Sequence, residues 1–180
     1  MADWEVITQG KVIGATTSNL DFTLIPGTYQ HLEFTISGRI EQVNYTNVYC
    51  HLNGDSGANY SYAGWASTQS SSGAVFRTNA FEGTAGSGMV GYAAGNNYST
   101  GAFSALSVII PNYAETGQNK VLLSRGAQGS GGFIDGYTSA MATGFAYTTA
   151  ITSATFFPYP SGGSVYWTAG TSYMLAGYKG

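Results

Sequence analysis

The sequence predicts an all-β protein, an antiparallel β-sandwich of jelly-roll type with about eleven short strands. Three observations lead to this prediction. Apolar and polar residues alternate with a period of two in several stretches, as they do along a strand with one buried face. Glycine accounts for 26 of the 180 residues and supplies turns throughout the chain. Only 8% of the residues are charged, too few for the solvated face that a surface helix needs.

The clearest alternation lies between residues 20 and 62. Three runs occur there, and Pro26-Gly27 and Asn53-Gly54 mark turns that end the first and the third of them. The alternating apolar residues are Leu20, Phe22 and Leu24, then Leu32, Phe34, Ile36 and Ile40, then Val48, Cys50 and Leu52. We expect the three runs to form adjacent strands of one sheet whose polar side faces water.

The other elements follow from shorter patterns. Residues 1–13 are predicted to form an edge strand or arm that reaches a neighbouring molecule, and residues 14–180 a single β-sandwich domain. Residues 63–73 are predicted to be a polar loop. Further strands are expected at 74–81, around 89–90, and at 102–110, 119–125, 132–142, 150–157, 164–168 and 171–178. Two packed sheets of jelly-roll type would protect the edges of so many strands.

The low charge restricts the possible partners. The net charge is -3 and the six basic residues are scattered, so we expect no nucleic-acid partner. No run approaches the roughly 20 apolar residues of a membrane helix, so we expect no membrane partner. A surface so poor in charge fits a protein covered by copies of itself or by another protein, and it also fits a monomer covered by Ser, Thr, Asn and Tyr.

We predict no catalytic residue, no metal site and no cofactor. His31 and His51 lie at outward positions of their strands and lack a convincing third ligand for zinc. The segment 53–59 resembles a calcium loop but lacks the acidic residue at the twelfth position, which favours a turn. Cys50 lies at an inward position and is expected in the core, and as the single cysteine it excludes an internal disulfide.

Aromatic residues at strand ends and in loops are the best candidates for a binding surface. Tyr and Trp in such places can anchor a protein interface or stack on sugars, and they can also shield the core. The candidate interface residues are Trp4, Val6, Tyr45, Tyr60, Tyr62, Trp65, Tyr98 and Tyr113.

Several short segments, taken together, resemble a family of tailed-bacteriophage virion proteins. They span nearly the whole chain and are Leu20-Asp21-Phe22 to Ile25-Pro26, Thr28-Tyr29-Gln30-His31-Leu32, Leu52-Asn53-Gly54-Asp55-Ser56-Gly57, Asn59-Tyr60-Ser61-Tyr62, Ile110-Pro111-Asn112-Tyr113-Ala114, Ala150-Ile151-Thr152-Ser153 and Gly170-Thr171-Ser172-Tyr173-Met174-Leu175-Ala176-Gly177-Tyr178. The resemblance implies a β-sandwich carried on the particle, either on the capsid or in the tail fibres, and no catalytic residues come with it. Modules of the family often end a longer fibre, whereas this sequence begins with Met1 and has no stalk, which favours a free-standing component.

The leading functional hypothesis is therefore a capsid decoration (cement) protein, not an enzyme. It would form a trimer or dimer, bind the major capsid protein, and reside in the virion after synthesis in the host cytoplasm. The alternative is a tail-fibre or receptor-binding module that recognises host surface glycans through its aromatic loops. A secreted carbohydrate-active enzyme is a third hypothesis, which would need two carboxylates about 5–10 Å apart.

Overall fold

The computed structural model describes residues 3–42, 45–70, 73–75, 81–96, 101–129, 137–159 and 164–180. These residues form thirteen strands and no helix, which confirms the all-β prediction. The strands are β1 (Trp4–Lys11), β2 (Leu20–Phe22), β3 (His31–Gly38), β4 (Thr46–Leu52), β5 (Tyr60–Ser70), β6 (Gly73–Val75), β7 (Phe81–Ala85), β8 (Gly88–Ala93), β9 (Ser104–Pro111), β10 (Lys120–Gln128), β11 (Tyr137–Phe145), β12 (Ala154–Pro158) and β13 (Ser172–Tyr178).

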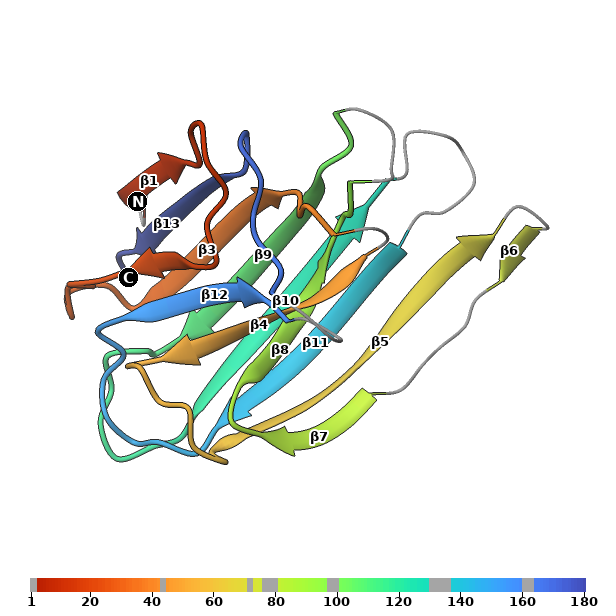
Figure 1. Ribbon diagram of the computed structural model, residues 1–180. Coiled ribbons are helices and arrows are strands. Elements are labelled where there is room, and N and C mark those ends of the chain that lie inside the picture. Colours follow the sequence, from red (N-terminus) through yellow and green to blue (C-terminus); the bar gives the residue numbers. More distant parts are fainter. Residues whose placement is uncertain are drawn as a thin grey trace.

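The strands form two antiparallel sheets that pack as a β-sandwich (Figure 1). The larger sheet has nine strands in the order β1-β13-β3-β9-β10-β11-β5-β6, and β7 also pairs with β5. The smaller sheet has four strands in the order β2-β12-β4-β8. In Figure 1 the smaller sheet crosses the middle of the larger one, while β5, β6 and β7 extend beyond it.

Eight strands show how the chain passes between the sheets. Strand β1 pairs with β13, β2 with β12, β3 with β9 and β4 with β8. One long antiparallel hairpin rolled over two sheets gives these four pairs, which is the connectivity of a jelly roll. We interpret the sandwich in this way, with β5–β7 inserted between β4 and β8, and β10 and β11 inserted between β9 and β12.

The three alternating runs near the N-terminus are strands, but the prediction that they are neighbours in one sheet is wrong. Strands β2 and β4 belong to the smaller sheet, with β12 between them, and β3 belongs to the larger sheet. Alternation shows only that one face of a strand is covered, and the strands of both layers of a sandwich share it. Leu24 is 92% exposed, because β2 ends at Phe22 and Leu24 has a positive φ of 56°.

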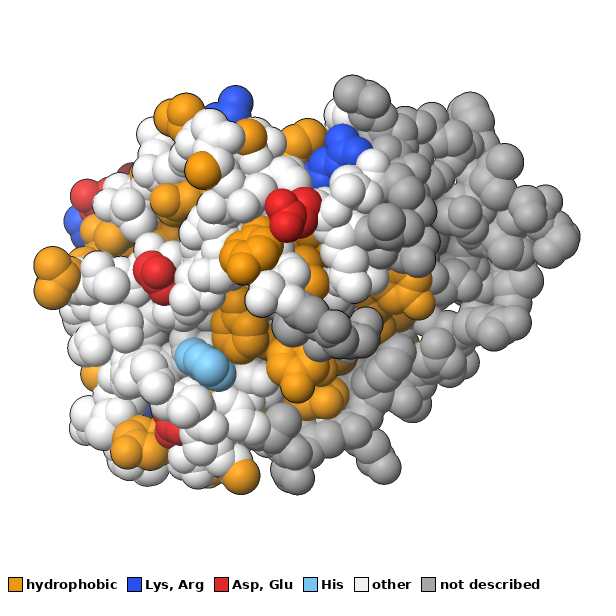
Figure 2. Space-filling model, in the orientation of Figure 1, with side chains coloured by type: hydrophobic (Ala, Val, Ile, Leu, Met, Phe, Trp, Pro, Cys, Tyr) orange, Lys and Arg blue, Asp and Glu red, His pale blue; other side chains and the backbone are white. Residues whose placement is uncertain are grey.

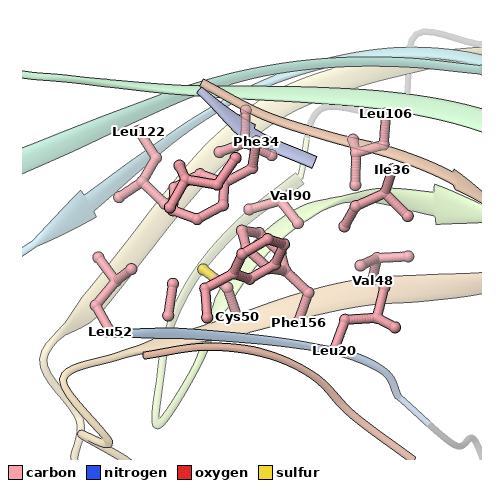
Figure 3. Close-up of a cluster of buried hydrophobic side chains, with 14 of the residues drawn as sticks. Leu20, Phe34, Ile36, Val48, Cys50, Leu52, Val90, Leu106, Leu122 and Phe156 are labelled. Carbon is pink, nitrogen blue, oxygen red and sulfur yellow. The ribbon is translucent and has the colours of Figure 1, made fainter. Parts of the chain in front are cut away.

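The inward side chains of the two sheets meet in one core (Figure 3). Phe34 and Leu106 reach it from the larger sheet, and Cys50 and Phe156 reach it from the smaller sheet. Phe22, Phe34 and Phe156 lie with ring centroids 5.0 to 5.8 Å apart, within the range that aromatic pairs prefer. Each buried ring stabilises the sandwich by about 1.5–3 kcal/mol relative to an exposed one.

The polar loop predicted at residues 63–73 is wrong, because residues 60–70 form the strand β5. This strand pairs with β11 from Tyr60 opposite Phe145 to Thr68 opposite Tyr137. Its Ala, Gly and Ser residues favour strands only weakly, so pairing with β11, which is distant in sequence, determines the structure here. The strand predicted at 164–168 is reduced to isolated bridges from Trp167.

The N-terminal segment forms the strand β1 at one end of the larger sheet. Strand β1 pairs with β13 of its own chain, and Lys179 joins it through an ion pair to Glu5 at 2.5 Å. The order of the larger sheet gives β1 no second strand partner among the described residues. Its predicted role as an arm toward a neighbouring molecule stays a prediction.

Candidate functional site

A group of ring side chains lies where the outer face of the smaller sheet meets β5 of the larger sheet, and we call it the aromatic patch. It consists of Tyr49 and His51 on β4, Phe157 on β12, Tyr159 just after β12, and Tyr62 on β5. The ring centroid of Tyr49 lies 5.0 Å from Tyr159, 6.2 Å from Tyr62 and 6.4 Å from Phe157. The His51 ring lies 4.7 Å from Phe157, so the five rings are continuous.

Strand pairing and backbone hydrogen bonds position these rings. Tyr49 and Phe157 are directly opposite in the β4–β12 pair, at outward positions, so their rings share one face. The N–H of Tyr159 donates to the carbonyl of Asn47 at 2.9 Å. The hydroxyl of Thr46 donates to the carbonyl of Tyr159 at 2.6 Å, so the chain after β12 is held beside the start of β4.

The environment of the patch disfavours charge on Tyr49 and His51. Burial raises the pKa of Tyr49 to about 12. Burial also lowers the pKa of His51, against the opposing effects of a backbone hydrogen bond and of Asp55. Desolvation disfavours the charged form of both groups, so neither ring carries a charge at neutral pH.

Part of the patch is accessible from outside. Tyr159 is 51% exposed, whereas Tyr49 is buried. Tyr45, which lies just before β4 and outside the patch, is 40% exposed. Figure 2 shows hydrophobic side chains gathered over the middle of this face, with few charged side chains among them. Protein interfaces show this composition, because their centres are rich in Tyr, Trp and Phe and poor in charge.

The interface candidates predicted from the sequence differ in their exposure and lie in different parts of the structure. The exposed ones are Trp4, Val6, Tyr45 and Trp65. Tyr62 is half-buried and belongs to the aromatic patch, and Tyr98 lies outside the described residues. Trp4 and Val6 on β1 are separated from Trp65 on β5 by five strands, so these residues do not form one site.

For Tyr60 and Tyr113 the interface prediction is wrong, because both side chains are buried. The hydroxyl of Tyr60 accepts a hydrogen bond from the N–H of Leu52 at 2.8 Å and donates to the carbonyl of Asp55 at 3.0 Å. The hydroxyl of Tyr113 donates to the carbonyl of Pro26. The hydroxyls of these two tyrosines form hydrogen bonds with backbone groups of neighbouring segments, so the side chains stabilise the fold from inside.

Of the patch, only Tyr62 was among the predicted interface candidates, and four residues were missed: Tyr49, His51, Phe157 and Tyr159. A signal for Phe157 was present, since adjacent residues of a strand point to opposite faces and Phe156 and Phe157 cannot both enter the core. No comparable signal exists for Tyr159, whose position depends on its contact with β4.

Comparison with known proteins assigns no family to this chain. No family model matches it, and no curated protein matches it. The burial, contacts and charge of the described residues are therefore the observations that bear on its function.

The outer face of the larger sheet is a second candidate surface. Cross-strand register places Glu33, Ile109 and Leu123 in one row across β3, β9 and β10. Two shallow hollows of about 520 and 300 Å³ lie on this face and share Thr35. They are lined largely by small and hydroxyl side chains, and Arg125 lines the smaller of the two.

The turn predicted at residues 53–59 is confirmed. Asn53 has a positive φ of 53°, and its side-chain oxygen accepts a hydrogen bond from the N–H of Thr152 at 2.8 Å. The carboxylate of Asp55 accepts hydrogen bonds from the N–H of Gly57 at 2.6 Å and from the amide of Asn59 at 2.7 Å. The oxygens that resembled calcium ligands are thus used in hydrogen bonds, those of Asp55 within the turn and that of Asn53 to Thr152.

The described residues contain no group of three His, Cys, Asp or Glu side chains that could hold a metal ion. Cys50 is buried in the core as predicted, and burial raises the pKa of its thiol to about 12, so the thiolate is not formed at neutral pH. None of the described residues forms a helix long and apolar enough to cross a membrane.

Proposed function

We propose that this protein is a structural subunit of a bacteriophage particle that decorates the capsid and stabilises it by contact with the major capsid protein. The aromatic patch is the observation on which the proposal depends. Its rings are continuous, Tyr159 is half-exposed, and burial keeps Tyr49 and His51 uncharged, as in the centre of a protein interface. The resemblance of the sequence to virion proteins supports the same role.

The contact would work by burying the exposed parts of these rings against capsid subunits. Tyr is enriched among the residues that dominate interface energies, because it buries a large ring with few rotatable bonds. Many symmetric copies on one shell would add weak individual contacts into a stable coat. In this role Tyr159 is the anchor, since it is the one exposed ring of the patch.

Binding to capsid shells tests the proposal. Shells assembled from the major capsid protein of the same particle are mixed with the purified chain and sedimented. We expect Tyr159→Ala to weaken binding about 30-fold, the effect of losing an interface anchor worth about 2 kcal/mol. Tyr147→Ala is the matched control, because Tyr147 is similarly exposed, at 44%, and lies outside the patch. Equal binding by both variants would contradict the role of the patch, and no binding by the unaltered chain would contradict the proposed function.

The second candidate function is recognition of neutral glycans at the same rings. One observation favours it: the side-chain amide of Asn47 lies 3.5 Å from the hydroxyl of Tyr49, so a hydrogen-bonding group accompanies the stacking surface. A glycan array with the unaltered chain and Tyr159→Ala separates the two functions. Specific glycan binding lost in the variant, without capsid binding, would favour the tail-fibre role.

A further inference from the structure

We propose that the outer face of the larger sheet pairs with the same face of a second copy of this chain, forming a two-fold dimer. This surface lies on the opposite side of the sandwich from the aromatic patch. The proposal does not depend on the virion role, because the same dimer would form in a free protein. A dimer of this kind leaves both aromatic patches free to bind another partner.

The composition of the face supports a covered surface. The outward apolar residues of β9 and β10 are Ile109, Val121 and Leu123, and the last two are 46% and 52% exposed. Around them the outward positions of β9, β10 and β11 hold mainly small residues, namely Ala105, Ser107, Ala127, Thr138, Ala140 and Ala142. Short side chains leave the middle of the sheet flat, so a second sheet can approach it closely there.

The size of the face fits a stable dimer. Seven strands from β1 to β5 follow one another across it. At about 4.8 Å between strands and about 3.4 Å per residue, the face measures roughly 29 by 27 Å, or about 780 Å². A standard protein interface buries about 800 Å² of each partner.

The charges of the face are self-complementary. Along β3, β9, β10 and β11, Glu33 is the one carboxylate, and Arg125 is the one outward Lys or Arg. Glu33 and Arg125 lie on strands separated by β9, and their rows of cross-strand partners are two residues apart along β9. Their Cα atoms are therefore about 12 Å apart, too far for the side chains to pair within one chain. The hydroxyl of Ser107, which lies in the row of Arg125, donates to the carboxylate of Glu33 at 2.7 Å and orients it on the face.

A two-fold axis satisfies both charges at once. If the axis lies in the interface over β9, between the two residues, Glu33 of each copy comes within reach of the long Arg125 side chain of the other. Ile109 lies on β9 itself and Leu123 beside it, so these apolar residues meet their own counterparts at the centre. The arrangement is isologous, as two-fold interfaces are, with an apolar centre and two ion pairs around it.

Charge reversal tests this arrangement. By light scattering coupled to size-exclusion chromatography at micromolar concentration, we expect the unaltered chain to have twice its 18.8 kDa chain mass. Glu33→Arg and Arg125→Glu should each raise the dissociation constant at least tenfold, because each places like charges in contact. The double variant E33R/R125E should dimerise again, and an equimolar mixture of the two single variants should form a mixed dimer.

Two controls complete the experiment. Lys11→Glu reverses a charge at the margin of the same face, so it should leave the dimer intact. Ile109→Cys places a thiol near the two-fold axis and should give a disulfide-linked dimer under oxidation, while the buried Cys50 does not compete. A monomer at 100 μM, a larger oligomer, or single variants as dimeric as the unaltered chain would overturn the proposal, as would failure of the double variant and of the mixture to dimerise.

Discussion

Tyr60→Phe tests whether a single buried hydroxyl joins the two sheets of the sandwich. Tyr60 is 1% exposed and begins β5 in the larger sheet, and its hydroxyl accepts the N–H of Leu52, the last residue of β4 in the smaller sheet. Phenylalanine keeps the ring, which stacks 4.8 Å from Phe145, and removes only the hydroxyl. The variant therefore leaves a buried N–H without its partner.

The cost follows from that unpaired group. An unsatisfied buried donor costs about 1–3 kcal/mol, so we expect the free energy of unfolding to fall by about 2 kcal/mol. The carbonyl of Asp55 also loses a donor, but this bond is only partly buried and adds less. With a urea m-value of about 2 kcal/mol/M, the urea midpoint should fall by about 1 M. For a chain of this length the same change lowers Tm by about 4–8 °C.

Equilibrium unfolding in urea, followed by far-UV circular dichroism and by tryptophan fluorescence, measures the change. Tyr147→Phe is the control, because its hydroxyl lies on an exposed ring and its loss should change the free energy of unfolding by less than about 0.5 kcal/mol. If Tyr60→Phe unfolds at the same urea concentration as the control, the hydroxyl of Tyr60 does not stabilise the junction of the sheets and the reasoning is refuted.

Three further outcomes are expected. The Cys50 thiol should not react with a disulfide reagent such as DTNB at pH 8 in the native protein and should react in full after unfolding, since burial raises its pKa to about 12; rapid native reaction would contradict its place in the core. Gly38→Ala should cost about 1–3 kcal/mol in thermal unfolding, because its added Cβ would lie 2.4 Å from the buried ring of Trp167; an unchanged Tm would show that the ring can move. Burial lowers the pKa of His51 below 6.5, so the stability that its neutral form contributes is complete above pH 6.5 and is lost as the pH falls toward the lowered pKa. Between pH 7 and pH 5 the Tm of His51→Gln should therefore fall less than the Tm of the unaltered chain. Equal falls in Tm would contradict the shift.

Local patterns in the sequence were sufficient for the fold class and for most strands. Alternation predicted β2, β3 and β4 and placed Cys50 in the core, because the side chains of a strand point alternately to its two faces. The turn at residues 53–59 followed from its Asn, Gly and Asp residues, whose backbone preferences are also local.

Long-range pairing decided the rest. Alternation is the same in both layers of a sandwich, so it could not show that β3 lies in one sheet and β2 and β4 in the other. Strand β5 forms because β11 pairs with it, although its own residues favour a strand only weakly. Tyr60 and Tyr159 have the same side chain, yet one is buried and the other half-exposed, because contacts with segments distant in sequence determine which hydroxyl meets a buried backbone group and which ring meets solvent.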